Sequence, residues 1–395
     1  MNNTDIRLLG LASFASMASM RMCDPMLLQW SSDFNATAGQ ASHVIAAFAI
    51  AYGVMQLVYG PLGDRFSKVR LIAWATALSA ALSVLTAWSV GIDSLLWSRS
   101  AMGAVAAGII PMSMALIGDQ VAYEWRQQTL ARLMSATVTG LMAGQWFGGF
   151  AAQYLGWRWA FYALAMVYAI ASVLLWRSDM LVMASGETNK GPVTVASYVR
   201  HLRDFFRAKL VQTVLLLTWV EGVLAFGALV FIPSVLIKDF HMSTSAAGAA
   251  MLLYGFGGLG YSYFAKRWIA WLGESGLATA GGGLIAIGLA LLLLTHHTLG
   301  ALSACLVIGM GLYMLHNVLQ TQATQMAPDN RSTALTMFAS LLFLGQSCGV
   351  ILLSWSLDAN WLHETLAVFA VAVACAGWTV SRQSPGKQTP ASSAS

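Results

Sequence analysis

Charged side chains are scarce in this chain. Asp, Glu, Lys and Arg make up 9% of its 395 residues, whereas hydrophobic residues make up 58%. Soluble globular domains usually carry about 25% charged residues. The composition therefore excludes a soluble domain of ordinary make-up and predicts a protein of the lipid bilayer.

Cysteine is also scarce, and nucleotide-binding motifs are absent. The four cysteines lie inside apolar segments, at spacings that match neither a metal site nor a disulfide framework. They are Cys23, Cys305, Cys348 and Cys375. The sequence has no GxxxxGK(S/T) loop, which argues against ATP-driven pumping. The sequence thus predicts neither an enzyme nor a bound metal or cofactor.

Long continuous apolar runs fill most of the chain. A helix needs roughly 20 mostly apolar residues to cross a bilayer, whereas a membrane barrel shows short alternating segments. The runs predict an all-α membrane protein with twelve transmembrane helices. Their expected ranges are residues 6–31, 42–63, 70–90, 95–117, 130–154, 157–176, 210–237, 245–265, 275–295, 299–325, 332–356 and 362–381.

The loops between these runs differ in their basic residues. If the N-terminus is cytoplasmic, the outer loops hold only Arg158 and Lys238, and all other basic loop residues are cytoplasmic. Basic loop residues stay on the cytoplasmic side, so both termini are expected there. The net charge of +5 is then a signal of orientation. Its spread over separate loops argues against nucleic-acid binding.

One polar segment, residues 178–209, divides the expected helices six and six. It predicts a first bundle over residues 1–177, a cytoplasmic linker over 178–209 and a second bundle over 210–382. The later part of the linker is amphipathic and basic, which is typical of a helix on an anionic membrane surface. Residues 383–395 are rich in Ser, Pro and Ala and are expected to form a disordered cytoplasmic tail.

The two halves also repeat each other. The segment "SSDFNATAGQA" after the first expected helix is similar to "IKDFHMSTSAA" after the seventh. Similarly, "AYGVMQLVYGPLGDRF" aligns in register with "LYGFGGLGYSYFAKRW". Two parallel six-helix repeats are the layout of the major facilitator fold. The sequence therefore predicts two pseudo-symmetric bundles of this kind.

The segment "GPLGDRFSKVR", residues 60–70, resembles the loop 2–3 signature of the major facilitator superfamily. The matching residues are Gly60, Gly63, Asp64, Arg65, Lys68 and Arg70. The resemblance implies a gating contact between Asp64 and the start of the eleventh helix, residues 331–333. Free N–H groups and the helix dipole favour an anion there. The alternative is a basic cluster that only fixes the topology.

Two further segments add to the resemblance. "LWSRSAMGAVAAG", residues 96–108, looks like the family's helix 4 motif. "GLMAGQWFGG", residues 140–149, resembles the helix 5 motif of antiporters, with Gln145 where that motif has Pro. A glycine packing seam is the alternative interpretation. The chain is most similar to bacterial drug and sugar-efflux proton antiporters, which implies a monomer of the bacterial inner membrane that works by alternating access.

Ionisable residues inside the expected helices mark a candidate site. A charge at the bilayer centre costs about 2.5–3.5 kcal/mol on insertion scales, so such residues usually face a cavity and pair. The five are Arg21, Asp24, Arg99, Glu221 and His316. They fall on the first, fourth, seventh and tenth helices only. In the facilitator fold, these four helices line the central cavity.

Depth along the helices predicts how these residues pair. Asp24 and Arg99 are expected at a similar height, and Arg21 lies one turn from Asp24 on the same face. Glu221 and His316 are both expected near mid-membrane. A buried carboxylate that gains and loses a proton suits proton coupling. Both acids remain open as the proton carrier, and the resemblance favours the pair of Asp24 with Arg99.

A polar stripe on the tenth helix predicts the substrate cavity. Its members recur at i, i+3, i+4 and i+7, and aromatic residues are expected across the cavity. The set is Tyr313, His316, Asn317, Gln320, Trp219, Phe226 and Gln145. It suits a small organic or amphiphilic substrate. The favoured hypothesis is export of such a molecule in exchange for protons, and the alternatives are proton-coupled uptake and lipid transport.

Overall fold

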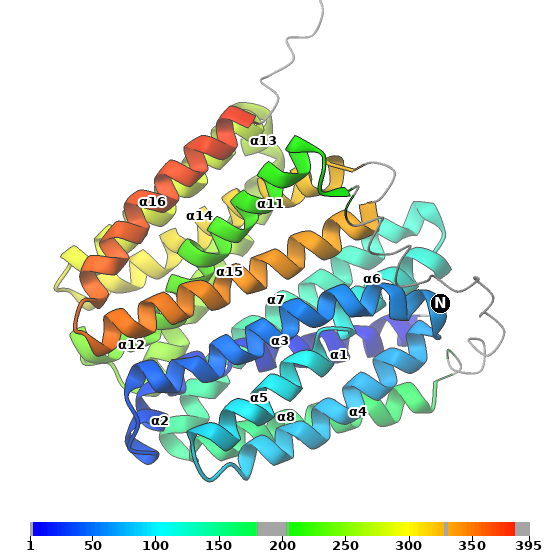
Figure 1. The fold of residues 1–395 in the computed structure, drawn as a ribbon, viewed down its shortest axis with the longest axis horizontal. Coiled ribbons are helices and arrows are strands. Elements are labelled where there is room, and N and C mark those ends of the chain that lie inside the picture. The colour runs from blue at the N-terminus through cyan, green and yellow to red at the C-terminus, as the bar shows by residue number, and fades with distance from the viewer. Residues whose placement is uncertain (1–2, 179, 181–202, 204, 328–330, 384–395) are drawn as a thin grey trace, which may run out of the picture.

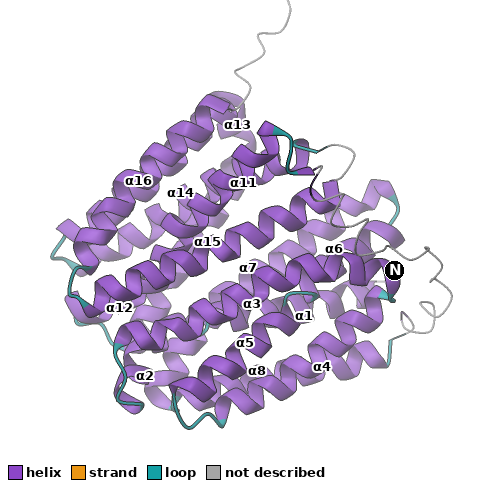
Figure 2. Cartoon of the chain, viewed as in Figure 1, coloured by secondary structure: helices purple, strands orange, loops and turns teal. Residues whose placement is uncertain are grey.

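The computed structural model describes residues 3–178, 180, 203, 205–327 and 331–383. The side chains of Asp64, Tyr123, Arg331 and Ser332 lie outside this description. Within the described ranges the regular structure is helical throughout and contains no strand (Figure 2). This confirms the predicted all-α fold. The expected linker helix and the expected disordered tail fall almost entirely outside the described residues.

The first half of the chain forms helices close to the expected ranges. They are α1 (Asn3–Arg21), η1 (Asp24–Met26), α2 (Leu27–Asp33), α3 (Ala38–Arg65), α4 (Lys68–Ala87), α5 (Ile92–Ala106), α6 (Ile109–Gln120), α7 (Tyr123–Tyr154) and α8 (Trp157–Trp176). Two expected helices are interrupted. The first breaks after Arg21 ahead of Pro25, which cannot donate a backbone hydrogen bond. The fourth breaks between α5 and α6.

The second half follows the same order. Its elements are α11 (Lys209–Glu221), the π-helical turn η3 (Gly222–Phe226), α12 (Gly227–Asp239), α13 (Thr244–Leu294), α14 (Thr298–Gln325), α15 (Arg331–Asp358) and α16 (Leu362–Gln383). The element α13 contains two expected helices, 245–265 and 275–295. A kink at Gly273 separates them, because its φ of 68° is a left-handed conformation that favours glycine.

Nine helical stretches of the described chain are long and apolar enough to cross a membrane. One of them is α13, whose 51 residues contain two of the expected helices. The broken first helix and the more polar α7 are not among the nine. The predicted number of twelve and the boundaries of the two bundles stay predictions.

The predicted repeat is visible in the backbone of two loops. Asn35 and His241, each two residues after an Asp-Phe pair begins, both have positive φ, at 50° and 52°. Thr37 and Ser243 then cap the next helices, and each side chain accepts a hydrogen bond from a backbone N–H in the first turn. The two similar segments therefore fold alike.

Glycines set close helix contacts within each half. A Cβ on Gly140, Gly144 or Gly148 of α7 would overlap a carbonyl oxygen of the segment from Phe14 to Met22. In the second half, Gly345 and Gly349 of α15 meet the carbonyl oxygens of Trp219 and Val223 in the same way. Residues 140–149 therefore form a glycine packing seam, because only glycine lets the two helix backbones come this close.

The two halves form separate groups of helices in the view of Figure 1, α1 to α8 in blue to blue-green and α11 to α16 in green to red. They touch along α3 with α15 and along α7 with α13. One end of the bundle carries the start of α1, the end of α3 and the start of α4, and we call it the proximal end. The opposite end, which carries the end of α2 and the end of α15, is the distal end.

Candidate functional site

Asp24 lies at the break in the first expected helix and is fully buried. Arg21 Nη1 donates to Asp24 Oδ2 over 3.4 Å, and Gln145 Nε2 donates to the same oxygen over 3.1 Å. The i,i+3 spacing across the break brings Arg21 and Asp24 together. The pair of Arg21 with Asp24 forms as predicted, and Gln145 joins it from α7.

Arg99 is also fully buried, but it has a different partner. Its guanidinium donates to Ser19 Oγ over 3.1 Å and to the Ser19 carbonyl oxygen over 2.9 Å. It also lies 4.1 Å from the centre of the Phe48 ring. Among the described residues, no carboxylate lies within ion-pair distance of Arg99. The predicted contact between Asp24 and Arg99 is absent here, because Ser19 holds the guanidinium more than a turn before Asp24.

Glu221 and His316 form a second pair. Glu221 ends α11 at the π-helical turn, and its Oε2 lies 3.2 Å from His316 Nδ1. Glu221 is buried, whereas His316 keeps 23% of its side chain exposed. Phe226 and Phe338 flank the imidazole, with ring centroids at 5.5 and 5.4 Å. The pairing expected from their similar depth is present.

The two pairs are linked across the two halves of the chain. The Arg21 guanidinium lies 5.8 Å from the centre of the Phe226 ring, and Phe226 in turn contacts His316. A continuous series therefore runs from Asp24 through Arg21, Phe226 and His316 to Glu221. The first two residues belong to the first half and the other three to the second half.

The predicted substrate stripe divides into exposed and half-buried members. Asn317 and Gln320 are exposed, whereas Tyr313, Trp219 and His316 are half-buried. Tyr313 also packs against Tyr254 of α13, with ring centroids 6.0 Å apart. The seventh predicted member, Gln145, is buried and bound to Asp24, so it does not belong to this stripe.

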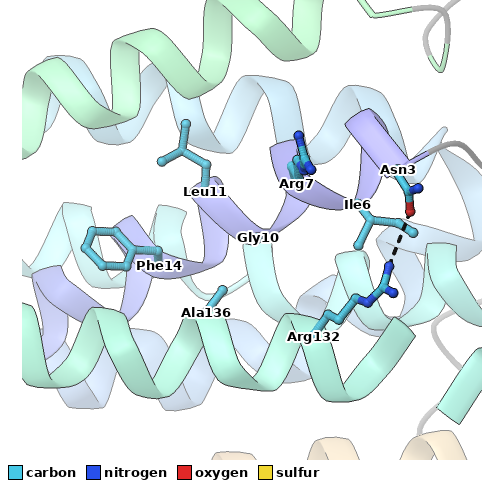
Figure 3. A pocket seen from close by; sticks show the side chains of 8 residues that line it. All are labelled: Asn3, Ile6, Arg7, Gly10, Leu11, Phe14, Arg132 and Ala136. Carbon is cyan, nitrogen blue, oxygen red and sulfur yellow. Dashed lines mark hydrogen bonds between the residues drawn. The ribbon is translucent and has the colours of Figure 1, made fainter. Parts of the chain in front are cut away.

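A cavity of about 610 Å³ opens beside α1 and α7 at the proximal end (Figure 3). Its lining is Asn3, Ile6, Arg7, Gly10, Leu11, Phe14, Arg132 and Ala136. Arg132 Nη1 donates to Asn3 Oδ1 over 3.2 Å at its edge. None of the predicted stripe residues lines this cavity. Its wall combines apolar side chains with two arginines, Arg7 and Arg132.

The distal end is closed by contacts between the halves. Asp358 of α15 accepts hydrogen bonds from Thr37 Oγ1 over 2.6 Å and from the Gly39 N–H over 2.9 Å. We call these three residues the distal clasp. Nearby, the Ser245 N–H donates to Gln153 Oε1 over 2.8 Å. At the proximal end, by contrast, a Cβ on Gly60 of α3 would meet no atom within 4 Å.

The predicted gating segment lies at the proximal end. Lys68 Nζ forms an ion pair with Asp119 Oδ2 at 2.8 Å, between the start of α4 and the end of α6. Gly63 packs against Met112, and a Cβ there would lie 2.5 Å from the sulfur. The expected contact of Asp64 with residues 331–333 depends on side chains outside the described set. It stays a prediction.

Sequence reasoning missed Ser19, Asp119 and Asp358 as partners. The segment "TAGQ", residues 37–40, carried a usable signal, since it forms a capping box in which Thr37 and Gln40 exchange hydrogen bonds. It marks the helix start that Asp358 covers. Ser19 carried no such signal, because a small hydroxyl in an apolar helix is usually a packing residue.

Related proteins are transporters. The transporter YgaY of Escherichia coli K12 is 26% identical over 175 residues, which cover 44% of this chain and 43% of that protein. The MFS-type transporter YceJ of Bacillus subtilis is 24% identical, with 62% of each chain covered. The multidrug export protein EmrB of Haemophilus influenzae is 26% identical over 43% of this chain and 33% of its own length. Each alignment spans less than two thirds of the relative.

Solved structures share the fold along almost the whole chain. A bacterial homologue of the lysosomal transporter Spinster superposes with a TM-score of 0.73 at 17% identity, with 95% of this chain and 96% of the other covered. A peptide transporter, POT, gives a TM-score of 0.76 at 13% identity, with 96% and 94% covered. The sequence model of the Major Facilitator Superfamily matches residues 9–350. The chain therefore belongs to the Major Facilitator Superfamily.

Proposed function

We propose that this protein exports a small organic or amphiphilic molecule from the bacterial cytoplasm in exchange for protons, as a monomer of the inner membrane. The observation that carries the proposal is the series from Asp24 to Glu221, which joins two buried acidic residues across the two halves. Secondary transporters of this superfamily bind near the interface of such halves, and alternating access rocks one against the other.

Both acids are suited to carry a proton. Asp24 Oδ1 and Glu221 Oε1 are buried and have no hydrogen-bond partner among the described residues. Burial of a charged carboxylate whose oxygen lacks a hydrogen-bond partner costs free energy, and protonation removes that cost. Each acid also keeps one basic neighbour, Arg21 or His316, that stabilises its charged form. Either state is therefore within reach.

The cavity supports loading from the cytoplasm. The loop basic residues favour a cytoplasmic N-terminus, so the proximal end would face the cytoplasm. There the cavity offers Ile6, Leu11 and Phe14 to an apolar group and Arg7 to a polar one. The closed distal clasp would then block the outer side. In the opposite state, Asp64 is proposed to close the proximal end against the start of α15.

Flux into proteoliposomes tests the exchange. Ethidium is a suitable amphiphilic probe, since its fixed charge prevents trapping by acid alone, and a neutral amphiphilic dye serves as the second probe. Antiport predicts dye accumulation in vesicles with an acidic lumen, because protons leave as dye enters. Protein-free vesicles and the double variant Asp24→Asn, Glu221→Gln are the controls. Accumulation only with an alkaline lumen would establish uptake by symport and refute export.

A further inference from the structure

Gln145 occupies an unusual position for an amide. It is fully buried on α7 beside the glycine seam, and Nε2 donates to Asp24 Oδ2. Its Oε1 has no partner among the described residues, and neither does Asp24 Oδ1. The amide and the acid are thus hydrogen-bonded through one atom each, and each keeps one unpartnered oxygen.

These two groups complement each other in both protonation states of Asp24. A carboxylate only accepts hydrogen bonds, and the amide donates to it through Nε2. A protonated carboxyl group instead has an O–H that needs an acceptor, and rotation of the amide presents Oε1 for it. An apolar side chain at position 145 could serve neither state.

Among the described residues, Arg21 is the other side chain that hydrogen-bonds Asp24. Arg21 can only donate, and Arg99 from α5 acts at longer range. Cys23 on the same segment and Tyr254 on α13 interact with Asp24 electrostatically, and in the described structure neither is hydrogen-bonded to it. The titratable residues of α2 and α12 lie at their distal ends: Asp33, Lys238 and Asp239. Gln145 is thus the hydrogen-bonding neighbour of Asp24 that can change its role.

The backbone of Gln145 lies at a close contact between the two halves. A Cβ on Gly248 of α13 would lie 2.7 Å from the Gln145 carbonyl oxygen. One turn further along α7, a Cβ on Gly149 would lie 3.2 Å from the Gly248 Cα. Any shift of α7 at Gln145 therefore acts directly on its contact with α13.

We propose that Gln145 is the positioning residue that reads the protonation state of Asp24 and transmits it to the contact between α7 and α13. With Asp24 charged, the amide donates and the closed distal contact seen here is favoured. With Asp24 protonated, the amide turns, and the contact between the halves loosens. The inference rests on the proposed coupling of protons through Asp24.

Infrared titration of the purified protein tests the hydrogen-bond exchange without any transport. The carboxyl C=O band of protonated Asp24 is assigned by its loss in Asp24→Asn. In Gln145→Met the band should appear at a pH higher by about one unit, because a hydrogen bond to the charged form outweighs one to the neutral form. It should also move to higher wavenumber, since the acid lacks its acceptor. Gln145→Ala should reproduce both shifts.

The same substitution at another buried glutamine is the matched control. Gln346 of α15 is equally buried and has no recorded contact with Asp24. Gln346→Met should therefore leave the Asp24 band unchanged in midpoint and position. An unshifted midpoint in both Gln145→Met and Gln145→Ala overturns the proposal, as does an equal shift in Gln346→Met.

Spin-label distances test the link to the interface. Labels at the exposed positions Tyr154 and Ala246 report the distal ends of α7 and α13. With Gln145 present, the distance between the two labels should increase as the pH falls through the infrared midpoint. Gln145→Met should abolish that increase. A full response in Gln145→Met refutes the coupling. If dye flux fails while both responses appear, the antiport proposal is wrong and this inference stands.

Discussion

The Asp358 carboxylate covers the first turn of α3, where it accepts a hydrogen bond from the Gly39 N–H at 2.9 Å. These residues are 319 positions apart and belong to opposite halves of the chain. A helix N-terminus has free N–H groups and a positive dipole end, so a carboxylate is stabilised there. This contact helps to tie the two halves together at the distal end.

Loss of the distal clasp should favour the opposite conformation. In Asp358→Asn the N-terminus of α3 loses its charged acceptor, which is worth about 1.5–3 kcal/mol for a hydrogen bond to a charged group. We expect the population with an open distal end to rise roughly tenfold. Distances between spin labels on α3 and α15 measure this. The control is Asp239→Asn, since Asp239 pairs with His363 of the same half at the same end.

Gly39 should tolerate no side chain while the clasp is closed. A Cβ there would overlap the Asp358 carboxylate and lie 2.7 Å from the Ser354 carbonyl oxygen. We expect Gly39→Ala to open the distal end as Asp358→Asn does. Gly60→Ala, on the same helix but facing open space, should behave as the wild type. Equal behaviour of the two alanine variants would contradict the closed contact.

The glycine seam predicts a stability difference. Gly148→Ala places a methyl group against the Met22 carbonyl oxygen, whereas Gly118→Ala meets no atom within 4 Å. Overpacking typically costs 1–3 kcal/mol, so Gly148→Ala should lower the thermal unfolding temperature by several degrees. Gly118→Ala should not, because alanine is also the better helix former. Unfolding in detergent, followed by tryptophan fluorescence, gives both values.

Replacing each acid by its amide, in Asp24→Asn and Glu221→Gln, should show which of the two carries the proton. Asn and Gln imitate the protonated acid, so the carrier's variant should lose the response to a pH gradient yet keep gradient-free exchange of dye. Asp24→Asn is expected to show this behaviour. Glu221→Gln should instead weaken dye binding, since it disturbs His316 of the predicted substrate stripe. If both variants respond normally to pH, neither acid carries the proton.

The sequence by itself determined the helical fold and much of the family resemblance. Continuous apolar runs leave helices as the solution for this chain in a bilayer, because backbone polar groups must be satisfied within each segment. The ionisable residues were also found from sequence, since a charge in an apolar run is conspicuous. The i,i+3 pair of Arg21 with Asp24 followed from local geometry alone.

Only the tertiary structure decided which distant residues meet. Arg99 was expected beside Asp24 because the two residues lie at a similar depth. Depth along a helix does not fix the direction of a side chain around the helix axis, and Arg99 binds Ser19 instead. Gln145 was expected among substrate contacts and lies on Asp24. The clasp of Asp358 with Gly39 depends on how two halves dock, and that docking is set by side-chain packing between helices far apart in the chain.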